Sequence, residues 1–271
     1  MGFSRPRVTM DPSQQLAEEY SAKADAYDRH WAPVIGPMAA PLFEALPLRG
    51  SKWIVDVGAG TGWHLDALAG AAPHARVLAI DRATGMLHFA RRRAQKRVAA
   101  MDAQSLALRS GVTDVATLIF MLFHLPDPGA ALREVRRILR RGGDVGIATW
   151  GRSDRVDLPV WTEELDACGA STDPRDPGVM QQALMDTPER LGQLLSRAGF
   201  VESRIWSRTF EHRWSLDAAM AVQETCGMAA RRLVSLDADA RAACESRVRA
   251  RLAKMDLRDR SEVLFAVASA P

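Results

Sequence analysis

The sequence has few cysteines and tyrosines, and it has no long apolar run. Its 271 residues include three cysteines and two tyrosines. Cys168, Cys226 and Cys244 are scattered and lack the paired spacing of metal ligands, so we expect reduced, structural thiols and no metal site. No run of about 18 apolar residues is present, and MGFSRPRVTM lacks the apolar stretch of a signal peptide. These absences predict a cytoplasmic protein with no membrane contact.

An excess of charge of one sign is also lacking. The 36 basic residues are nearly matched by 33 acidic ones, and the formal net charge is only +3. Two basic runs, at 91–97 and 133–141, are typical of solvated helix faces, because long Arg stems cover apolar surface while their charges stay in water. Neither run requires a polyanion, so we expect no nucleic-acid partner.

The segment from Trp53 to His64, WIVDVGAGTGWH, carries the strongest positive signal. It begins as an apolar run typical of a buried parallel strand, and glycines follow at positions 58, 60 and 62. Glycines permit a tight turn in which backbone N–H groups approach a ligand closely. A strand, a glycine turn and a helix in this order predict a nucleotide or nucleoside site. The dinucleotide fingerprint needs a further glycine where Trp63 stands, which weakens a nicotinamide assignment.

Three later segments follow the glycine turn. An apolar strand at 77–80 ends at Asp81, a short strand precedes Asp102, and a strand at 115–120 leads into MLFHLPDP. With Asp56 two residues before the first glycine, the four segments together resemble those of the class I S-adenosylmethionine-dependent methyltransferases. The resemblance covers roughly residues 20–150. It implies the fold and S-adenosyl-L-methionine as cofactor, and it says little about the substrate.

The resemblance also implies roles for individual residues. Asp81 would accept hydrogen bonds from two ribose hydroxyls, although an Asp here is also a common helix N-cap. Asp102 and Ala103 would flank the adenine, and the helix beginning at Gly62 would receive the methionine carboxylate. The implied cofactor contacts are Tyr27, Asp56, Gly58, Ala59, Gly60, Thr61, Gly62, Asp81, Arg82, Met86, Asp102, Ala103 and Met121.

Strand and helix patterns alternate along the chain as far as Trp150. We expect strands at 53–57, 76–81, 97–101, 115–120 and 143–150, and helices at 62–70, 84–94 and 128–139. This alternation predicts an α/β, doubly wound, Rossmann-like sheet whose ligands bind outside the carboxyl ends of the strands. The family adds two strands, here 200–214 and 262–269, which make a seven-stranded, mostly parallel sheet with an antiparallel last strand.

Helical additions are expected around this core. Residues 1–50, with a helix at 13–29 and a second segment at 37–46, are predicted to form an N-terminal lid, and residues 51–271 the methyltransferase core. Insertions at about 151–186 and 215–258 interrupt the core, with a helix at 187–198 between them. A helix pair in the second insertion, joined to the first, is expected to form a cap over the substrate.

Histidines are the candidates for acid–base chemistry. His124 is the titratable residue in the loop after the fourth strand, and its ordinary pKa of about 6.5 would suit a general base. The alternative is that His124 packs against the cofactor or caps the loop. His64 is a weaker candidate that would line the methionine end, and His30 could enter the site from the lid.

The same loop limits the classes of methyl acceptor. It reads FMLFH, without the Asn or Asp followed by Pro-Pro and an aromatic residue that base-methylating amino methyltransferases carry. We therefore expect a methyltransferase that acts on an oxygen, carbon or nitrogen atom of a small, apolar or aromatic metabolite. A homodimer is compatible with this expectation. Two alternatives stay open, an NAD-dependent oxidoreductase and a member of the same fold that does not transfer methyl groups.

Overall fold

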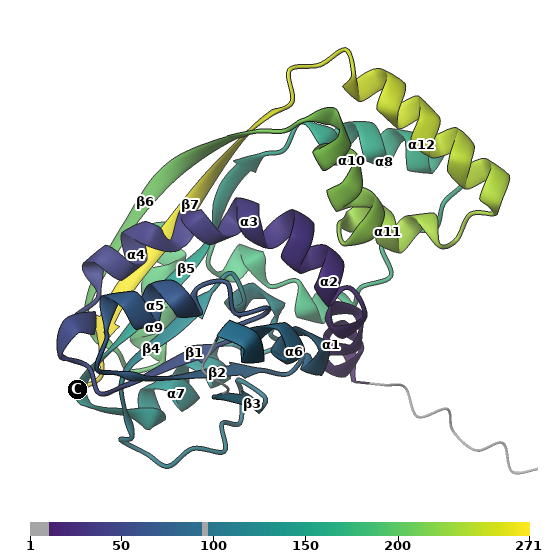
Figure 1. The fold of residues 1–271 in the computed structure, drawn as a ribbon. Coiled ribbons are helices and arrows are strands. Elements are labelled where there is room, and N and C mark those ends of the chain that lie inside the picture. The colour runs from purple at the N-terminus through teal and green to yellow at the C-terminus, as the bar shows by residue number, and fades with distance from the viewer. Residues whose placement is uncertain (1–10, 94–96) are drawn as a thin grey trace, which may run out of the picture.

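A seven-stranded sheet forms the centre of the computed structural model, which describes residues 11–93 and 97–271. The strands run in the order β3-β2-β1-β4-β5-β7-β6 (Figure 1). Their bounds are β1 Trp53–Val57, β2 Arg76–Asp81, β3 Val98–Ala100, β4 Thr113–Ile119, β5 Leu139–Asp154, β6 Val201–Arg213 and β7 Arg258–Ser269. β1 to β5 pair in parallel, and β7 is antiparallel to both β5 and β6. The predicted doubly wound sheet with an antiparallel last strand is confirmed.

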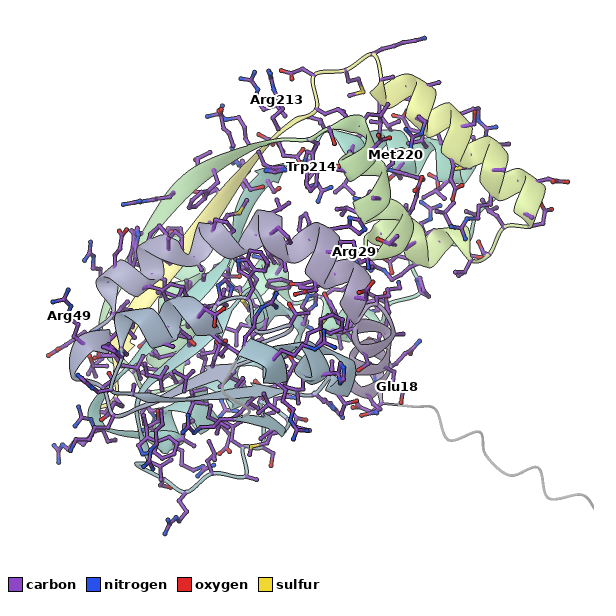
Figure 2. The ribbon with its side chains drawn as sticks, in the orientation of Figure 1. Glu18, Arg29, Arg49, Arg213, Trp214 and Met220 are labelled. Atoms are coloured by element: carbon purple, nitrogen blue, oxygen red, sulfur yellow. The ribbon has the colours of Figure 1, made fainter. Side chains whose placement is uncertain are left out.

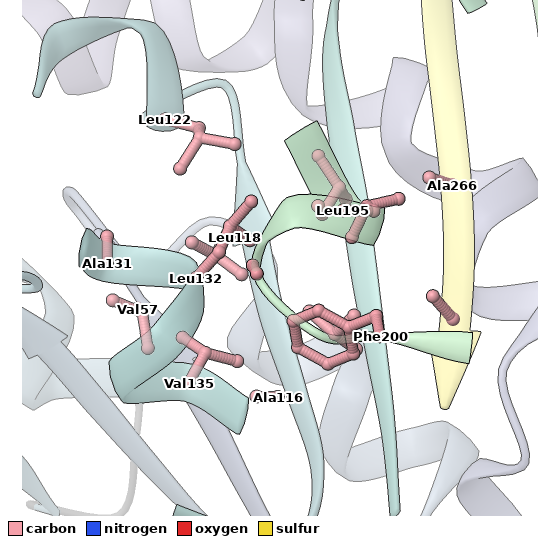
Figure 3. Packing of buried hydrophobic residues seen from close by; sticks show 14 of the residues in the cluster. Val57, Ala116, Leu118, Leu122, Ala131, Leu132, Val135, Leu195, Phe200 and Ala266 are labelled. Carbon is pink, nitrogen blue, oxygen red and sulfur yellow. The ribbon is translucent and has the colours of Figure 1, made fainter. Parts of the chain in front are cut away.

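Helices cover both faces of the sheet, as a doubly wound fold requires. On one face, α7 (Pro128–Ile138) and α9 (Pro188–Arg197) bury apolar residues such as Leu132 and Leu195 against the strands (Figure 3). The other face is covered by α4 (Ala40–Ala45), α5 (Leu65–Ala71) and α6 (Thr84–Arg93). Both sides of the central strands are therefore dry, and polar side chains that point into the sheet there lose their contact with water.

The helix after the glycine turn begins later than the sequence indicated. Gly58, Gly60 and Gly62 all have positive φ angles, of 73°, 55° and 77°. A helix cannot include these conformations, so α5 starts at Leu65 with His64 as its N-cap, rather than at Gly62. The predicted helix start at Gly62 is therefore wrong, and the expected contact with a methionine carboxylate stays a prediction.

Other element boundaries also moved. β5 extends beyond the predicted 143–150 at both ends, because Leu139 pairs with Thr113 of β4 and Asp154 pairs with Arg260 of β7. The second insertion contains three helices instead of a pair, namely α10 (Leu216–Thr225), α11 (Met228–Leu233) and α12 (Ala238–Leu252). Residue 94, the predicted end of α6, lies outside the described residues.

Residues 12–45 form a chain of short helices across the sheet. α1 (Pro12–Ala22) ends with Lys23 as its C-cap, so the predicted helix at 13–29 is interrupted. The elements between α1 and α4 are α2 (Ala24–Ala26), the π-helical turn η1 (Tyr27–Trp31), α3 (Ala32–Ile35) and η2 (Gly36–Ala39) (Figure 1). α1 packs closely on α6 at Gly85, where a Cβ atom would lie 2.3 Å from the backbone oxygen of Ser21. Arg93 of α6 also binds Asp28 of η1 at 2.8 Å.

The two insertions pack against each other. α8 (Asp157–Ala167), from the first insertion, joins α10, α11 and α12 in a separate apolar cluster, which we call the cap cluster. It lies at one end of the molecule, and Trp214 and Met220 lie where β6 passes into α10 (Figure 2). Asp259 of β7 ties the cluster to the sheet, because it accepts hydrogen bonds from the Trp214 indole at 2.7 Å and the Val156 N–H at 2.9 Å.

Asp56 is a carboxyl group buried within the central strands. It is only 1% exposed, and its Oδ1 accepts a hydrogen bond of 2.7 Å from the Thr117 hydroxyl of β4. Its Oδ2 has no partner among the described residues. Burial raises the pKa of Asp56 to about 7, against the lowering effect of Thr117.

We predict that Asp56→Asn stabilises the protein increasingly as the pH rises. Unfolded Asp releases its proton near pH 3.8, whereas folded Asp56 keeps its proton up to about pH 7. Stability from this residue is therefore fully present below pH 3.8 and is lost as the pH rises to 7, by an amount on the order of 4 kcal/mol for three pH units. The Asn side chain does not ionise, so the variant keeps its stability as the pH rises.

Urea unfolding at pH 5, 6, 7 and 8 measures the difference. The gain in unfolding free energy of Asp56→Asn over wild type should grow up to about pH 7 and then level off. Asp66→Asn, exposed on α5, is the matched control and should show no such trend. A difference that is constant across these pH values would contradict a raised pKa at Asp56.

Candidate functional site

A cavity of about 1050 Å³, including its open mouth, lies at the carboxyl ends of β1, β2 and β4. Its wall combines the glycine loop, the ends of these strands, the loop after β3 and the inner side of the N-terminal helices. The loop turns sharply because the Gly58 and Ala59 N–H groups donate to the Ile80 carbonyl of β2, at 2.7 and 2.9 Å. The glycines therefore hold the β1–α5 connection against β2 and leave room beside it.

Asp81 lies at the end of β2 and faces this cavity. Its carboxylate accepts hydrogen bonds from the Gly60 N–H and the Ala83 N–H, both at 2.8 Å. Burial raises the pKa of Asp81, and these two backbone donors oppose that shift. One acid thus fixes the tip of the glycine loop and remains exposed to a ligand in the cavity, which suits a pair of vicinal hydroxyls.

Asp102 marks the other end of the cavity. It follows β3, and its Oδ1 accepts a hydrogen bond from the Gln104 N–H at 2.8 Å, which forms a tight turn. Arg82 lies 3.4 Å from Asp102 and 2.9 Å from Asp11, the N-cap of α1. These contacts link the first N-terminal helix to the predicted adenine end.

Two tyrosines close the cavity from the N-terminal helices. Tyr20 of α1 and Tyr27 of η1 both line it, with their rings 6.0 Å apart in an edge-to-face arrangement. The π-helical turn places Tyr27 over the glycine loop, a distortion that often occurs at functional sites. The Tyr20 hydroxyl reaches His124 Nε2 at 3.0 Å, a contact between residues 104 positions apart.

His124 lies in η4 (Leu122–His124), directly after β4. Burial, and then the positive charge of Arg175, lower its pKa to about 3, while burial raises the pKa of the Tyr20 hydroxyl to about 12. Both side chains are therefore neutral over the physiological range, and the tautomer of His124 decides which of the two donates the hydrogen bond. The ordinary pKa of about 6.5 that made His124 a candidate base is not retained in the folded protein, because burial disfavours the charged ring.

The predicted methionine end is apolar. His64, Trp63 and Ile35 line it, and burial lowers the pKa of His64 to about 4. Phe120, at the end of β4, has a φ angle of 52° and stacks on Trp150 with ring centroids 4.4 Å apart. This unusual backbone conformation directs the chain from β4 into the His124 loop.

Most of the predicted contacts meet in this cavity. The lining includes Tyr27, Gly58, Ala59, Gly60, Thr61, Asp81, Arg82, Met86, Asp102, Ala103, Met121 and His124. Asp56, Gly62 and His30 lie outside it. Asp56 faces Thr117 inside the sheet, and Gly62 packs against α6, where a Cβ would lie 2.8 Å from the Cα of Ala90. His30 is held in η1 away from the lining residues, so the structure does not bring it to the site.

Tyr20, Trp63 and Phe120 line the cavity without having been assigned to it from the sequence. A signal for Tyr20 was present, because the two tyrosines of the chain stand seven residues apart, on one face of a helix. No sequence pattern indicated Phe120, whose position depends on its backbone conformation. Among the described residues, no group of three or more His, Cys, Asp or Glu side chains is placed to hold a metal ion. No described helix is long and apolar enough to cross a membrane.

Known proteins share both sequence and fold with this chain. A family model for a methyltransferase domain matches residues 55–147. The chain is 31% identical over 150 residues to a malonyl-[acyl-carrier protein] O-methyltransferase of Hahella chejuensis, covering 53% of this chain and 52% of the relative. It is 39% identical over 123 residues to a demethylmenaquinone methyltransferase of Mycolicibacterium vanbaalenii, covering 45% and 53%. The chain thus spans about half the length of these curated relatives.

A solved structure resembles the whole chain. The [4+2]-cyclase SpnF aligns with a TM-score of 0.59 at 18% identity, over 94% of this chain and 96% of the other. At this identity the likeness concerns the fold alone. The match at 55–147 covers the strands and loops that build the cavity. By these matches, residues 55–147 are similar to a methyltransferase domain.

Proposed function

We propose that this protein transfers a methyl group from S-adenosyl-L-methionine to a small organic acceptor. The observation that carries the proposal is the convergence of the glycine loop, Asp81, Asp102 and His124 on one cavity at the carboxyl ends of the strands. The cavity residues fit the cofactor. Asp81 would present its carboxylate to the ribose, Asp102 and Ala103 would flank the adenine, and the backbone of the glycine loop would line the methionine end.

The bound cofactor supplies an electrophilic methyl group on a sulfonium, so the protein has mainly to orient the acceptor and exclude water. The Tyr20–His124 contact joins α1 to the loop after β4 and closes the cavity between them. Because the pKa of His124 is about 3, we propose that His124 acts as a positioning residue with Tyr20, rather than as a base that titrates near pH 6.5. Residues 1–50 then act as a lid, and the insertions at 151–186 and 215–258 act as a cap.

The walls at the predicted methionine end favour an apolar or aromatic acceptor. Phe120 lines the cavity and stacks on Trp150, and Trp150 lies 6.5 Å, between ring centroids, from Trp31 of the lid. Related enzymes carry names that include demethylmenaquinone and malonyl-[acyl-carrier protein] as methyl acceptors. These names support a small metabolite as the acceptor class. The homodimer and the cytoplasmic location stay predictions of the sequence.

We predict that Asp81→Asn weakens cofactor binding. Loss of the charged acceptor should raise the Kd for S-adenosylhomocysteine by about 10- to 150-fold, equivalent to about 1.5–3 kcal/mol for charged hydrogen bonds. Isothermal titration measures the change, with Asp239→Asn, exposed on α12, as the matched control. Unchanged affinity in Asp81→Asn would show that this residue does not bind the cofactor. Tight binding of NADH, with no binding of S-adenosyl-L-methionine or S-adenosylhomocysteine, would overturn the proposed function.

Methyl transfer itself is tested with a panel of quinones, phenols, carboxylic acids and amines. Isotope from labelled S-adenosyl-L-methionine should appear in one acceptor class, at a rate that depends on enzyme concentration. If the cofactor binds and no acceptor gains a methyl group, a member of the fold that does not transfer methyl groups becomes the better account.

We predict that Tyr20→Phe and His124→Ala act through one shared contact. Each should speed dissociation of S-adenosylhomocysteine by up to about tenfold, because one hydrogen bond contributes about 0.5–1.5 kcal/mol. The double variant should be no faster than the faster single variant, since both changes remove the same interaction. Stopped-flow measurement of dissociation gives these rates, and His88→Ala, exposed on α6, is the control.

Additive effects in the double variant would show that the two side chains act separately. An ionisation near pH 6.5 in turnover that disappears in His124→Ala would instead restore His124 as a titrating base.

A further inference from the structure

Two of the three cysteines meet inside the cap cluster. Cys168 is the C-cap residue of α8, and Cys244 lies in the middle of α12, fully buried. The two helices pack side by side in the cap (Figure 1), Cys168 packs against the apolar cluster that contains Cys244, and Arg247, about one helical turn after Cys244, donates to the Cys168 sulfur. Both are free thiols in this structure, and they are 76 positions apart in the sequence. Their spacing matches no motif, so the sequence alone does not predict that they meet.

The surroundings of the two thiols differ in a way that favours reaction at Cys168. Cys168 is partly exposed, and the Arg247 guanidinium of α12 donates to its sulfur at 2.6 Å. A neighbouring cation stabilises the thiolate, which is the reactive form of cysteine. Arg247 also binds Glu164 at 2.8 Å, and Arg251 binds the same Glu164 at 2.9 Å, so two cations share one carboxylate.

Cys244 has the opposite character. It is fully buried, and burial together with its neighbour Cys168 raises its pKa to about 12, which keeps it as a thiol. A solvent oxidant therefore meets Cys168 first. An accessible thiol with a cation on one side and a second thiol on the other is the arrangement that oxidation-sensitive cysteines use.

We propose that Cys168 and Cys244 are an oxidation-sensitive thiol pair, in which a peroxide oxidises Cys168 and Cys244 then closes a disulfide between α8 and α12. In the first step, the Cys168 thiolate attacks hydrogen peroxide, forms the sulfenic acid and releases hydroxide. In the second step, the Cys244 sulfur displaces the sulfenic oxygen, the S–S bond forms, and the thiol proton and the hydroxyl group leave as water. Two electrons pass from the two sulfurs to the peroxide.

The disulfide would link the two insertions directly. It would close a loop from residue 168 to residue 244, which contains α9, β6, α10 and α11. Closing a long loop restricts the unfolded chain, so the oxidised protein should melt at a higher temperature than the reduced protein. Neither cysteine lines the cofactor cavity, and cofactor affinity should be the same in both forms.

Cys226 provides a matched control within the same chain. It ends α10, is half-buried, and its sulfur donates to the Val222 carbonyl at 3.5 Å. No described cysteine is hydrogen-bonded to it. Cys226→Ser should therefore leave the disulfide between residues 168 and 244 intact.

The test treats the folded, full-length protein with hydrogen peroxide and then blocks the remaining thiols with iodoacetamide. Mass spectrometry should find a loss of two hydrogen atoms and a peptide pair joined through Cys168 and Cys244. Dithiothreitol should reverse the bond and the upward shift in Tm. Cys168→Ser and Cys244→Ser should each abolish the joined peptide pair, and Arg247→Gln should slow its formation several-fold.

The proposal is overturned if both thiols of the peroxide-treated wild type still react with iodoacetamide after denaturation. It is also overturned if the bond joins Cys226 or a second chain. These readouts come from the wild-type protein, so they hold even if a serine variant fails to fold. A disulfide that forms equally fast in Arg247→Gln would overturn the part assigned to the guanidinium.

Discussion

The left-handed backbone at Gly58, Gly60 and Gly62 is the constraint on which the rest of the site depends. It turns the chain so sharply after β1 that the loop contacts both β2 and α6. The turn delays α5 to Leu65 and opens the space that Asp81 and Asp102 face. Residues with side chains adopt such φ angles only at a cost in free energy, and a Cβ at Gly62 would also collide with Ala90. The cavity therefore depends on the absence of side chains at these glycines.

Burial then sets the chemistry of the polar groups around this loop. Burial shifts the pKa of Asp56, Asp81, His64 and His124 in the direction that favours the neutral form. Near neutral pH, the histidines that line the cavity therefore carry no charge. A reaction that begins from a cationic methyl donor is compatible with such a site, because orientation and the exclusion of water can supply much of its rate.

Helices from distant parts of the chain complete the enclosure. α1 contacts α6 through Gly85, binds Arg82 through Asp11, and reaches the cap through Glu19, which lies 3.3 Å from Arg231 of α11. Arg231 also binds Asp173 of the first insertion at 3.2 Å. The lid, the cap and the core therefore form one network of contacts around the Tyr20–His124 pair, although α1, α6 and α11 lie far apart in the sequence.

The sequence by itself determined the sheet, its order of strands and helices, and the glycine loop with its following acids, because these features depend on local patterns of apolar, glycine and acidic residues. It placed Asp81, Asp102 and His124 at the same edge, because the carboxyl ends of parallel strands coincide. It did not reveal that Asp56 turns into the sheet toward Thr117, or that His30 stays outside.

Only the tertiary structure decided which groups share a cavity and how they ionise. The pairing of Tyr20 with His124, the low pKa of that histidine and the meeting of Cys168 with Cys244 all arise from contacts between residues more than 70 positions apart. Such contacts depend on how helices dock after the strands have paired. A pattern of neighbouring residues does not predict that docking. It also does not predict a pKa shift by desolvation, which depends on every group that surrounds the side chain in space.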